Sequence, residues 1–145
     1  MAKEHRVRKM KSMGSNIRVG IAGYGVVGQR RKACIERHPG MEVVAVCDRK
    51  FLSTGALDDG VFCFSNYNDL LDEPIDALFV CLTNEIAAEV TISGLKKGLH
   101  VFCEKPPGRH VEDIRNVMRV EKLNPKLKLM YGFNHRHHDS VKDAT

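Results

Sequence analysis

The chain has 145 residues, of which 43% are hydrophobic and 28% are charged, and this is the composition of a single globular domain. No apolar run approaches the roughly 20 residues that a membrane-spanning helix needs, and the N-terminus lacks the apolar core of a secretory signal. We therefore expect a protein that neither crosses a membrane nor has a membrane partner.

The positive charge of the chain is concentrated at its N-terminus. The formal net charge is +5, and residues 1–16 contribute +4 of it through five basic residues and one acidic residue. We expect these residues to form a disordered, solvated tail, or to precede an alternative start at Met13. Contact with nucleic acid is the weaker alternative, because no aromatic residue alternates with these charges to stack on bases. We predict no nucleic-acid partner.

The five cysteines are odd in number and form no Cys-x-x-Cys pair, so they indicate neither a disulfide framework nor a thiol redox site. Disulfides are typical of oxidising compartments, and we therefore expect free thiols and a reducing, cytoplasmic location. The cysteines are Cys34, Cys47, Cys63, Cys81 and Cys103.

The strongest motif begins where an apolar run at residues 17–22 ends. This run predicts a buried strand, and a helix over 26–36 and a second strand over 42–47 follow it. A glycine-rich turn joins the first strand to the helix, which is the arrangement that a dinucleotide requires. The residues that we assign to cofactor binding in this turn are Gly23, Tyr24, Gly25, Val26, Val27 and Gly28.

Each glycine of this turn has a physical reason. Gly23 allows a sharp turn out of the strand, Gly25 lets a pyrophosphate approach the backbone, and Gly28 lets the helix pack close to the strand. The N-terminus of the helix then offers free N–H groups and the positive end of its dipole to the phosphates. A glycine-rich turn without a ligand remains the simpler alternative for the motif by itself.

Asp48 ends the second strand, about 20 residues after Gly28. A carboxylate at that position can accept hydrogen bonds from the ribose hydroxyls of adenosine, which favours NAD. Arg49 follows directly and could pair with the 2′-phosphate of NADP instead, or it could be a solvated loop residue. We predict NAD as the cofactor and leave NADP open.

The rest of the chain alternates strands with helices. Residues 49–59 are polar and irregular, with room for one helical turn, and Asn66 or Asn68 is expected to cap a short helix. Thr83 or Asn84 is expected to cap a long helix that Gly98 ends. The remaining strands are predicted at 61–64, 76–82, 100–103 and 127–133, and the helices at about 66–71, 84–97 and 111–123.

This alternation predicts an α/β fold with a doubly wound parallel sheet, the Rossmann dinucleotide-binding fold, with about six strands in the order 3-2-1-4-5-6. We expect a basic tail over residues 1–16 and the NAD(P)-binding domain over 17–137. Residues 138–145, where a further helix is expected to start, would begin a connection to a substrate domain.

Two further motifs lie in the second half of the chain. Glu104-Lys105-Pro106 follows the strand at 100–103, and Gly132-Phe133-Asn134-His135-Arg136 closes the strand at 127–133. With Tyr67-Asn68-Asp69-Leu70-Leu71 and the glycine turn, they make the chain resemble the N-terminal half of the glucose–fructose oxidoreductase/inositol dehydrogenase (Gfo/Idh/MocA) family. The resemblance covers residue 17 to the end of the chain.

The resemblance implies an NAD- or NADP-dependent oxidoreductase that acts on a secondary alcohol of a sugar, inositol or sugar nucleotide. It implies that Lys105 is the catalytic lysine, that the Lys105–Pro106 bond is cis, and that the full-length protein is a homo-oligomer. It also implies a second domain with the substrate wall and a catalytic histidine. A nucleotide-binding module, or a fragment without turnover, is the alternative. The further cofactor contacts that it implies are Leu82, Thr83, Asn84, Glu104, Lys105 and Asn134.

The chain departs from the family pattern after Thr83. Many members have Thr-Pro there and a histidine four residues later, and both the proline and the histidine are missing here. The detailed contacts to the nicotinamide ribose are therefore open. His135, His137 and His138 form a dense group, but they lack a recognised ligand arrangement, and we predict no metal site.

Overall fold

The sheet predicted from the sequence is present in the computed structural model, which describes residues 15–144. Residues 1–14 and 145, and with them most of the expected basic tail, lie outside this description. The strands are β1 (Ile17–Ala22), β2 (Met41–Cys47), β3 (Gly55–Ala56), β4 (Phe62–Phe64), β5 (Ala77–Val80), β6 (His100–Cys103) and β7 (Leu129–Tyr131).

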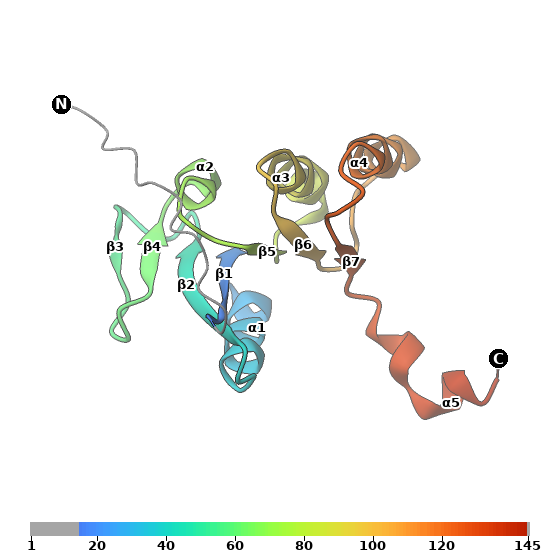
Figure 1. The fold of residues 1–145 in the computed structure, drawn as a ribbon, viewed down its shortest axis with the longest axis horizontal. Coiled ribbons are helices and arrows are strands. Elements are labelled where there is room, and N and C mark those ends of the chain that lie inside the picture. The colour runs from blue at the N-terminus through green and yellow to red at the C-terminus, as the bar shows by residue number, and fades with distance from the viewer. Residues whose placement is uncertain (1–14, 145) are drawn as a thin grey trace.

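The seven strands lie in the order β3-β4-β2-β1-β5-β6-β7 (Figure 1). β3 runs antiparallel to β4, and the other neighbouring pairs are parallel. Without β3, this is the predicted order 3-2-1-4-5-6, in which the chain reverses direction across the sheet beside β1. The carboxyl ends of the parallel strands therefore meet along one edge of the sheet.

Helices cover both faces of the sheet, as the doubly wound fold requires. α1 lies on one face, and α2, α3 and α4 lie side by side on the other (Figure 1). A 3₁₀ turn and a last short helix follow β7 and lead away from the layers (Figure 1). The helices are α1 (Val26–Glu36), α2 (Tyr67–Leu71), α3 (Asn84–Lys96), α4 (Val111–Lys122), η1 (Asn134–His137) and α5 (Asp139–Lys142).

The central strands are buried because both faces of the sheet are covered there. Ile21 of β1 packs in the cluster beneath α1 with Ile35, while Leu78 and Val80 of β5 pack in the cluster beneath α2, α3 and α4. Ile21, Leu78 and Val80 each have an exposed fraction of 0%. Continuous apolar runs are typical of parallel strands buried in this way.

The prediction of about six strands and an irregular segment at residues 49–59 was incomplete. Gly55 and Ala56 form β3, and no helical turn is present between Arg49 and Asp59. The turn that follows is closed by a hydrogen bond from Leu57 N to Val61 O of 2.8 Å. Gly60 has a φ of +84° in that turn, which an L side chain rarely adopts. A two-residue strand has too few residues to show an alternating pattern, so it leaves no signal in the sequence.

Other boundaries differ by one or two residues at an end, which is usual for strand and helix ends. The strand predicted at 76–82 is confined to Ala77–Val80, and the strand predicted at 127–133 is confined to Leu129–Tyr131. Asn66 is the cap of α2, because its side chain accepts a hydrogen bond from Asn68 N at 2.8 Å. Thr83 lies at the N-cap position of α3 but makes no side-chain capping bond.

Within residues 15–144, no helix combines the length and the apolar character that crossing a membrane requires. All five cysteines are free thiols.

Candidate functional site

The glycine turn lies at the carboxyl end of β1 and packs directly against the end of β5. Gly23 has a φ of +93°, and a Cβ at this position would lie 2.3 Å from the carbonyl oxygen of Cys81. Its N–H donates to Cys47 O at 2.9 Å, so the turn is also tied to β2. Only glycine fits both the backbone conformation and the space.

The other two glycines of the motif face different surroundings. A Cβ at Gly28 would lie 2.0 Å from Gly23 O, so α1 is packed against the turn itself. A Cβ at Gly25 would have no atom within 4 Å, so this side of the turn is open. The structure thus separates a glycine that the fold needs from a glycine whose open face is free for a ligand.

α1 begins at this open side. Its first residues, Val26 and Val27, have exposed fractions of 67% and 44%, and Gln29 N donates to Gly25 O at 3.0 Å. The N–H groups before Gln29 have no acceptor within the helix. They point outward at the positive end of the helix dipole, which is the arrangement that binds an anion such as a pyrophosphate.

Asp48 follows β2 and is bound to the glycine turn. Its Oδ2 accepts a hydrogen bond from Tyr24 N at 2.8 Å, and its Oδ1 accepts one from Lys50 N at 3.0 Å. The side chain is half-buried. Each carboxylate oxygen retains a second lone pair, so Asp48 can hold the turn in place and still accept a hydrogen bond from a ribose hydroxyl.

Lys50 is a site residue that the sequence did not indicate. Its Nζ donates to Tyr24 O at 2.5 Å and lies 5.0 Å from the centre of the Tyr24 ring and 5.6 Å from that of Phe51. The Tyr24 and Phe51 rings stack with centroids 6.1 Å apart. Asp48 and Lys50 thus bind the two backbone polar groups of Tyr24. Arg49, by contrast, is exposed and has no hydrogen bond or ion pair to any residue of 15–144.

The loop after β5 lies beside the glycine turn. The Cδ2 of Leu82 would be 3.1 Å from a Cβ on Gly23, and Thr83 and Asn84 follow at the start of α3. Thr83 is exposed and Asn84 is half-buried. The structure therefore brings the predicted residues Leu82, Thr83 and Asn84 to the same edge as the glycine turn.

Glu104 and Lys105 follow β6 along this edge. Glu104 N donates to Val80 O at 2.9 Å, and the Glu104 carboxylate forms an ion pair with Arg31 of α1. Lys105 is exposed, and its ammonium group has no hydrogen bond or ion pair within the described part of the chain. The Lys105–Pro106 bond is cis, as the family resemblance implied.

Asn134 lies farther along the same edge of the sheet, as the first residue of η1 after β7. Its N–H donates to Gly132 O at 3.1 Å, and Gly132 N donates to Cys103 O at 2.9 Å, which ties this segment to β6. The Asn134 side chain is exposed, and no hydrogen bond joins it to Lys105. These two residues both follow strands that end at this edge of the sheet.

The thiols near this edge are not suited to covalent chemistry. Burial raises the pKa of Cys47 to about 11 and that of Cys81 to about 12, and it also raises the pKa of Cys103. These thiols are therefore protonated at neutral pH, and a thiol is a poor nucleophile.

The rings of His135 and His138 stack 5.1 Å apart. Among residues 15–144, no group of three or more His, Cys, Asp or Glu side chains is arranged to hold a metal ion.

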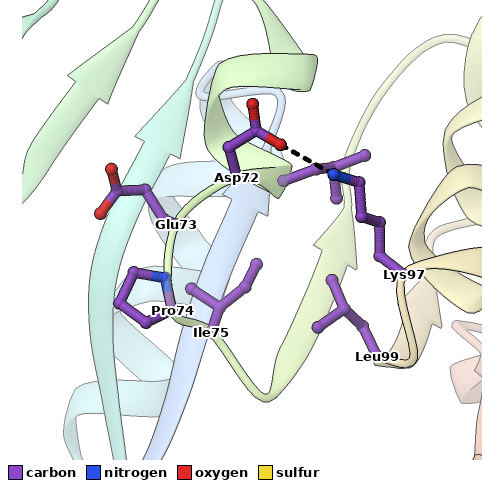
Figure 2. Close-up of a pocket in the computed structure, with 7 residues that line it drawn as sticks. Asp72, Glu73, Pro74, Ile75, Lys97 and Leu99 are labelled. Atoms are coloured by element: carbon purple, nitrogen blue, oxygen red, sulfur yellow. Dashed lines mark hydrogen bonds and ion pairs between the residues drawn. The ribbon is translucent and has the colours of Figure 1, made fainter. Parts of the chain in front are cut away.

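A pocket of about 260 Å³ lies at the opposite end of the strands. Figure 2 shows it between the residues that precede β5 and those that precede β6, with the Asp72–Lys97 ion pair of 2.7 Å across its mouth. It is separated from the glycine turn by the length of the sheet, because the turn follows the carboxyl end of β1. The pocket is therefore not part of the candidate cofactor site.

Comparison with known proteins identifies the fold. Residues 17–133 match the model of the Gfo/Idh/MocA oxidoreductase family, NAD-binding Rossmann fold. The chain is 33% identical over 129 residues to inositol 2-dehydrogenase of Salmonella typhimurium and 33% identical over 135 residues to D-glucoside 3-dehydrogenase of Escherichia coli. These alignments cover 83% and 88% of this chain and 38% of each relative.

A solved structure gives the same result. Scyllo-inositol dehydrogenase from Lactobacillus casei, determined with bound NAD(H) and scyllo-inositol, superposes with a TM-score of 0.77 at 27% identity. The match covers 90% of this chain and 40% of that one. The chain thus spans about two fifths of the length of the relatives that it matches. It belongs to the Gfo/Idh/MocA oxidoreductase family, and residues 17–133 form the NAD-binding Rossmann domain of that family.

Proposed function

We propose that this chain binds NAD across the carboxyl edge of its sheet. The observation that carries the proposal is the glycine turn, whose open side at Gly25 lies next to the exposed N-terminus of α1. The pyrophosphate would lie on Gly25 and on the N–H groups of Val26 and Val27, and Asp48 would bind the adenosine ribose. The family match and the NAD(H)-bound relative support this assignment.

The other half of the cofactor would extend toward β6 and β7. Leu82, Thr83 and Asn84 would line the nicotinamide ribose, and Glu104 and Asn134 would lie near the nicotinamide ring. Because Glu104 is paired with Arg31, it would contribute to this part of the site mainly through its backbone. NADP is the alternative cofactor, and the guanidinium group of Arg49, which has no partner among residues 15–144, could bind its 2′-phosphate.

For the whole protein, we propose an oxidoreductase that acts on a secondary alcohol of a sugar-like substrate. The named relatives are dehydrogenases of inositols and of a D-glucoside. Bound NAD would supply the hydride acceptor for this oxidation, and the alcohol would lose its hydroxyl proton and become a ketone. Lys105 would donate a hydrogen bond to the substrate oxygen and stabilise the negative charge that develops on it.

This activity is tested with the protein in its full natural length. Formation of NADH is followed by absorbance with a panel of inositols and D-glucosides. Loss of one such hydrogen-bond donor typically lowers kcat by about 10²–10³, so K105M should lose at least about a hundredfold. K126M, which removes another exposed lysine, is the control. A K105M enzyme within twofold of the wild type would contradict the role of Lys105.

A nucleotide-binding module without turnover is the second candidate. The observation in its favour is that the chain spans only 38% of the length of the dehydrogenases that it matches. Reading the gene past the codon for Thr145 distinguishes the two, since a further domain supports an enzyme.

We also propose a homo-oligomer in the cytoplasm, without a nucleic-acid or membrane partner. Sedimentation of the full-length protein tests the oligomer.

A further inference from the structure

The acidic residue next to Lys105 turns away from it. The Glu104 carboxylate pairs with the Arg31 guanidinium, which comes from α1, 73 positions away in the sequence. The Glu104 side chain is only 10% exposed, and that of Arg31 is 31% exposed. A carboxylate that is this far removed from water needs a cation or several hydrogen bonds to remain charged. Arg31 is therefore the group that keeps Glu104 where it lies.

Two further contacts fix the geometry of this pair. The Arg31 guanidinium lies 5.0 Å above the centre of the Phe102 ring, and that ring stacks on Phe79 at 4.9 Å. On the other side, a Cβ at Gly132 would lie 2.7 Å from the Oε2 of Glu104. Glu104 is thus enclosed between α1 and the end of β7, with little room to adopt another rotamer.

The ion pair between Arg31 and Glu104 affects Lys105, the residue that follows Glu104. Its ammonium group is exposed and has no partner within residues 15–144, although a carboxylate is attached to the preceding residue. A Glu104 side chain without Arg31 would leave its buried position, because an unpaired buried carboxylate is costly. Lys105 is the cation directly beside it in the sequence.

We propose that Arg31 is a positioning residue, which holds Glu104 against α1 so that the Lys105 ammonium stays free for substrate. This proposal rests on the role given to Lys105 above. It assigns a function to a helix residue that lies outside the glycine motif and makes no hydrogen bond to Lys105.

The test measures how fast the Lys105 amine reacts with a limiting amount of acetic anhydride at fixed pH, read by mass spectrometry of the 145-residue chain. Pairing with a carboxylate stabilises the ammonium form and lowers the reactivity of the amine. An exposed ion pair corresponds to a factor of up to about five. We expect R31Q to lower the Lys105 rate by roughly two- to fivefold relative to Lys126, the internal reference.

Three variants separate this effect from a general loss of structure. R30Q makes the same charge change on the preceding residue of α1, which is exposed, and should leave the Lys105 rate unchanged. The double variant R31Q/E104Q removes the carboxylate and should restore the wild-type Lys105 rate. R31K keeps a cation beside Glu104 and should keep most of the wild-type rate. G132A changes the residue after β7, where the new Cβ would lie 2.7 Å from the Oε2 of Glu104. It should lower the Lys105 rate as R31Q does, which keeps the proposal testable if R31Q does not fold.

An unchanged Lys105 rate in folded R31Q and G132A would overturn the proposal, and so would an equal loss in R31Q and R31Q/E104Q. Because no cofactor is needed for the labelling, its outcome is independent of NAD binding. A chain that binds no NADH but shows the predicted labelling would refute the proposed cofactor site, while the part of the inference in which Arg31 keeps Glu104 away from Lys105 would still hold.

Discussion

Gly25 and Gly28 belong to one motif, but the structure assigns them opposite roles, and a pair of alanine variants can separate these roles. In G28A the new Cβ would lie 2.0 Å from Gly23 O, where ordinary contacts begin at 3.4 Å. The backbone would have to move by more than about 1 Å at a turn that is already bound to Cys47. In G25A the new Cβ would meet no atom within 4 Å.

These contacts set the expected size of each effect. Overpacking a dense site costs about 1–3 kcal/mol, and the rigid backbone contact places G28A near the upper end. Alanine recovers about 1 kcal/mol of helix propensity, so the net loss should be about 2 kcal/mol, or a fall in Tm of about 6–10 °C. G25A should change the free energy of unfolding by less than about 1 kcal/mol.

Although G25A should leave the stability of the chain nearly unchanged, it should weaken the binding of NADH. The methyl group of G25A would occupy the face that the pyrophosphate approaches, and similar overpacking in the complex should weaken NADH binding by about tenfold or more. Thermal unfolding by circular dichroism and titration with NADH measure the two properties on the same samples. The reasoning is refuted if G28A is as stable as the wild type, or if G25A binds NADH normally.

The remaining predictions concern Asp48, one ion pair and the thiols. D48A should weaken NADH binding more than NADPH binding in parallel titrations, and an unchanged preference would sink the assignment of Asp48 to the ribose. The hydrogen bond from Lys32 lowers the pKa of Asp59, so the stability that this pair adds should be complete above about pH 4 and be lost as the pH falls through the lowered pKa. The difference in Tm between the wild type and D59N should therefore shrink from pH 6 to pH 3, and a constant difference would contradict the pairing. Iodoacetamide at pH 7.5 should modify exposed Cys34 first and half-buried Cys81 much more slowly, because loss of solvation raises the pKa of Cys81 to about 12; labelling of Cys81 as fast as that of Cys34 in the folded chain would contradict the raised pKa.

Local patterns made much of the fold predictable. The glycine turn, the apolar runs of β1 and β5 and the Lys-Pro step after β6 each lie within a few residues, so their structural meaning can be recognised from adjacent positions. Gly98, which ends α3, is a signal of the same kind. The order of the strands followed because a doubly wound sheet with this motif at its first turn has few alternatives.

Contacts between distant segments were missed for the same reason. Lys50 and Tyr24 are 26 positions apart, and Arg31 and Glu104 are 73 apart, so no sequence window contains either pair. Glu104 was assigned to the cofactor with no sign in the neighbouring residues that its carboxylate also pairs with Arg31. The β3 strand was missed because its two residues depend on a turn at Gly60 rather than on any side-chain pattern.

A titration of this chain with NADH is the direct test of its proposed NAD site. The chain contains no Trp, so the fluorescence of the bound nicotinamide can be followed against a low protein background. We predict saturable binding of NADH, which is tighter than that of NADPH and is weakened in G25A. A folded chain that shows no saturable signal with either nucleotide at millimolar concentration would contradict it.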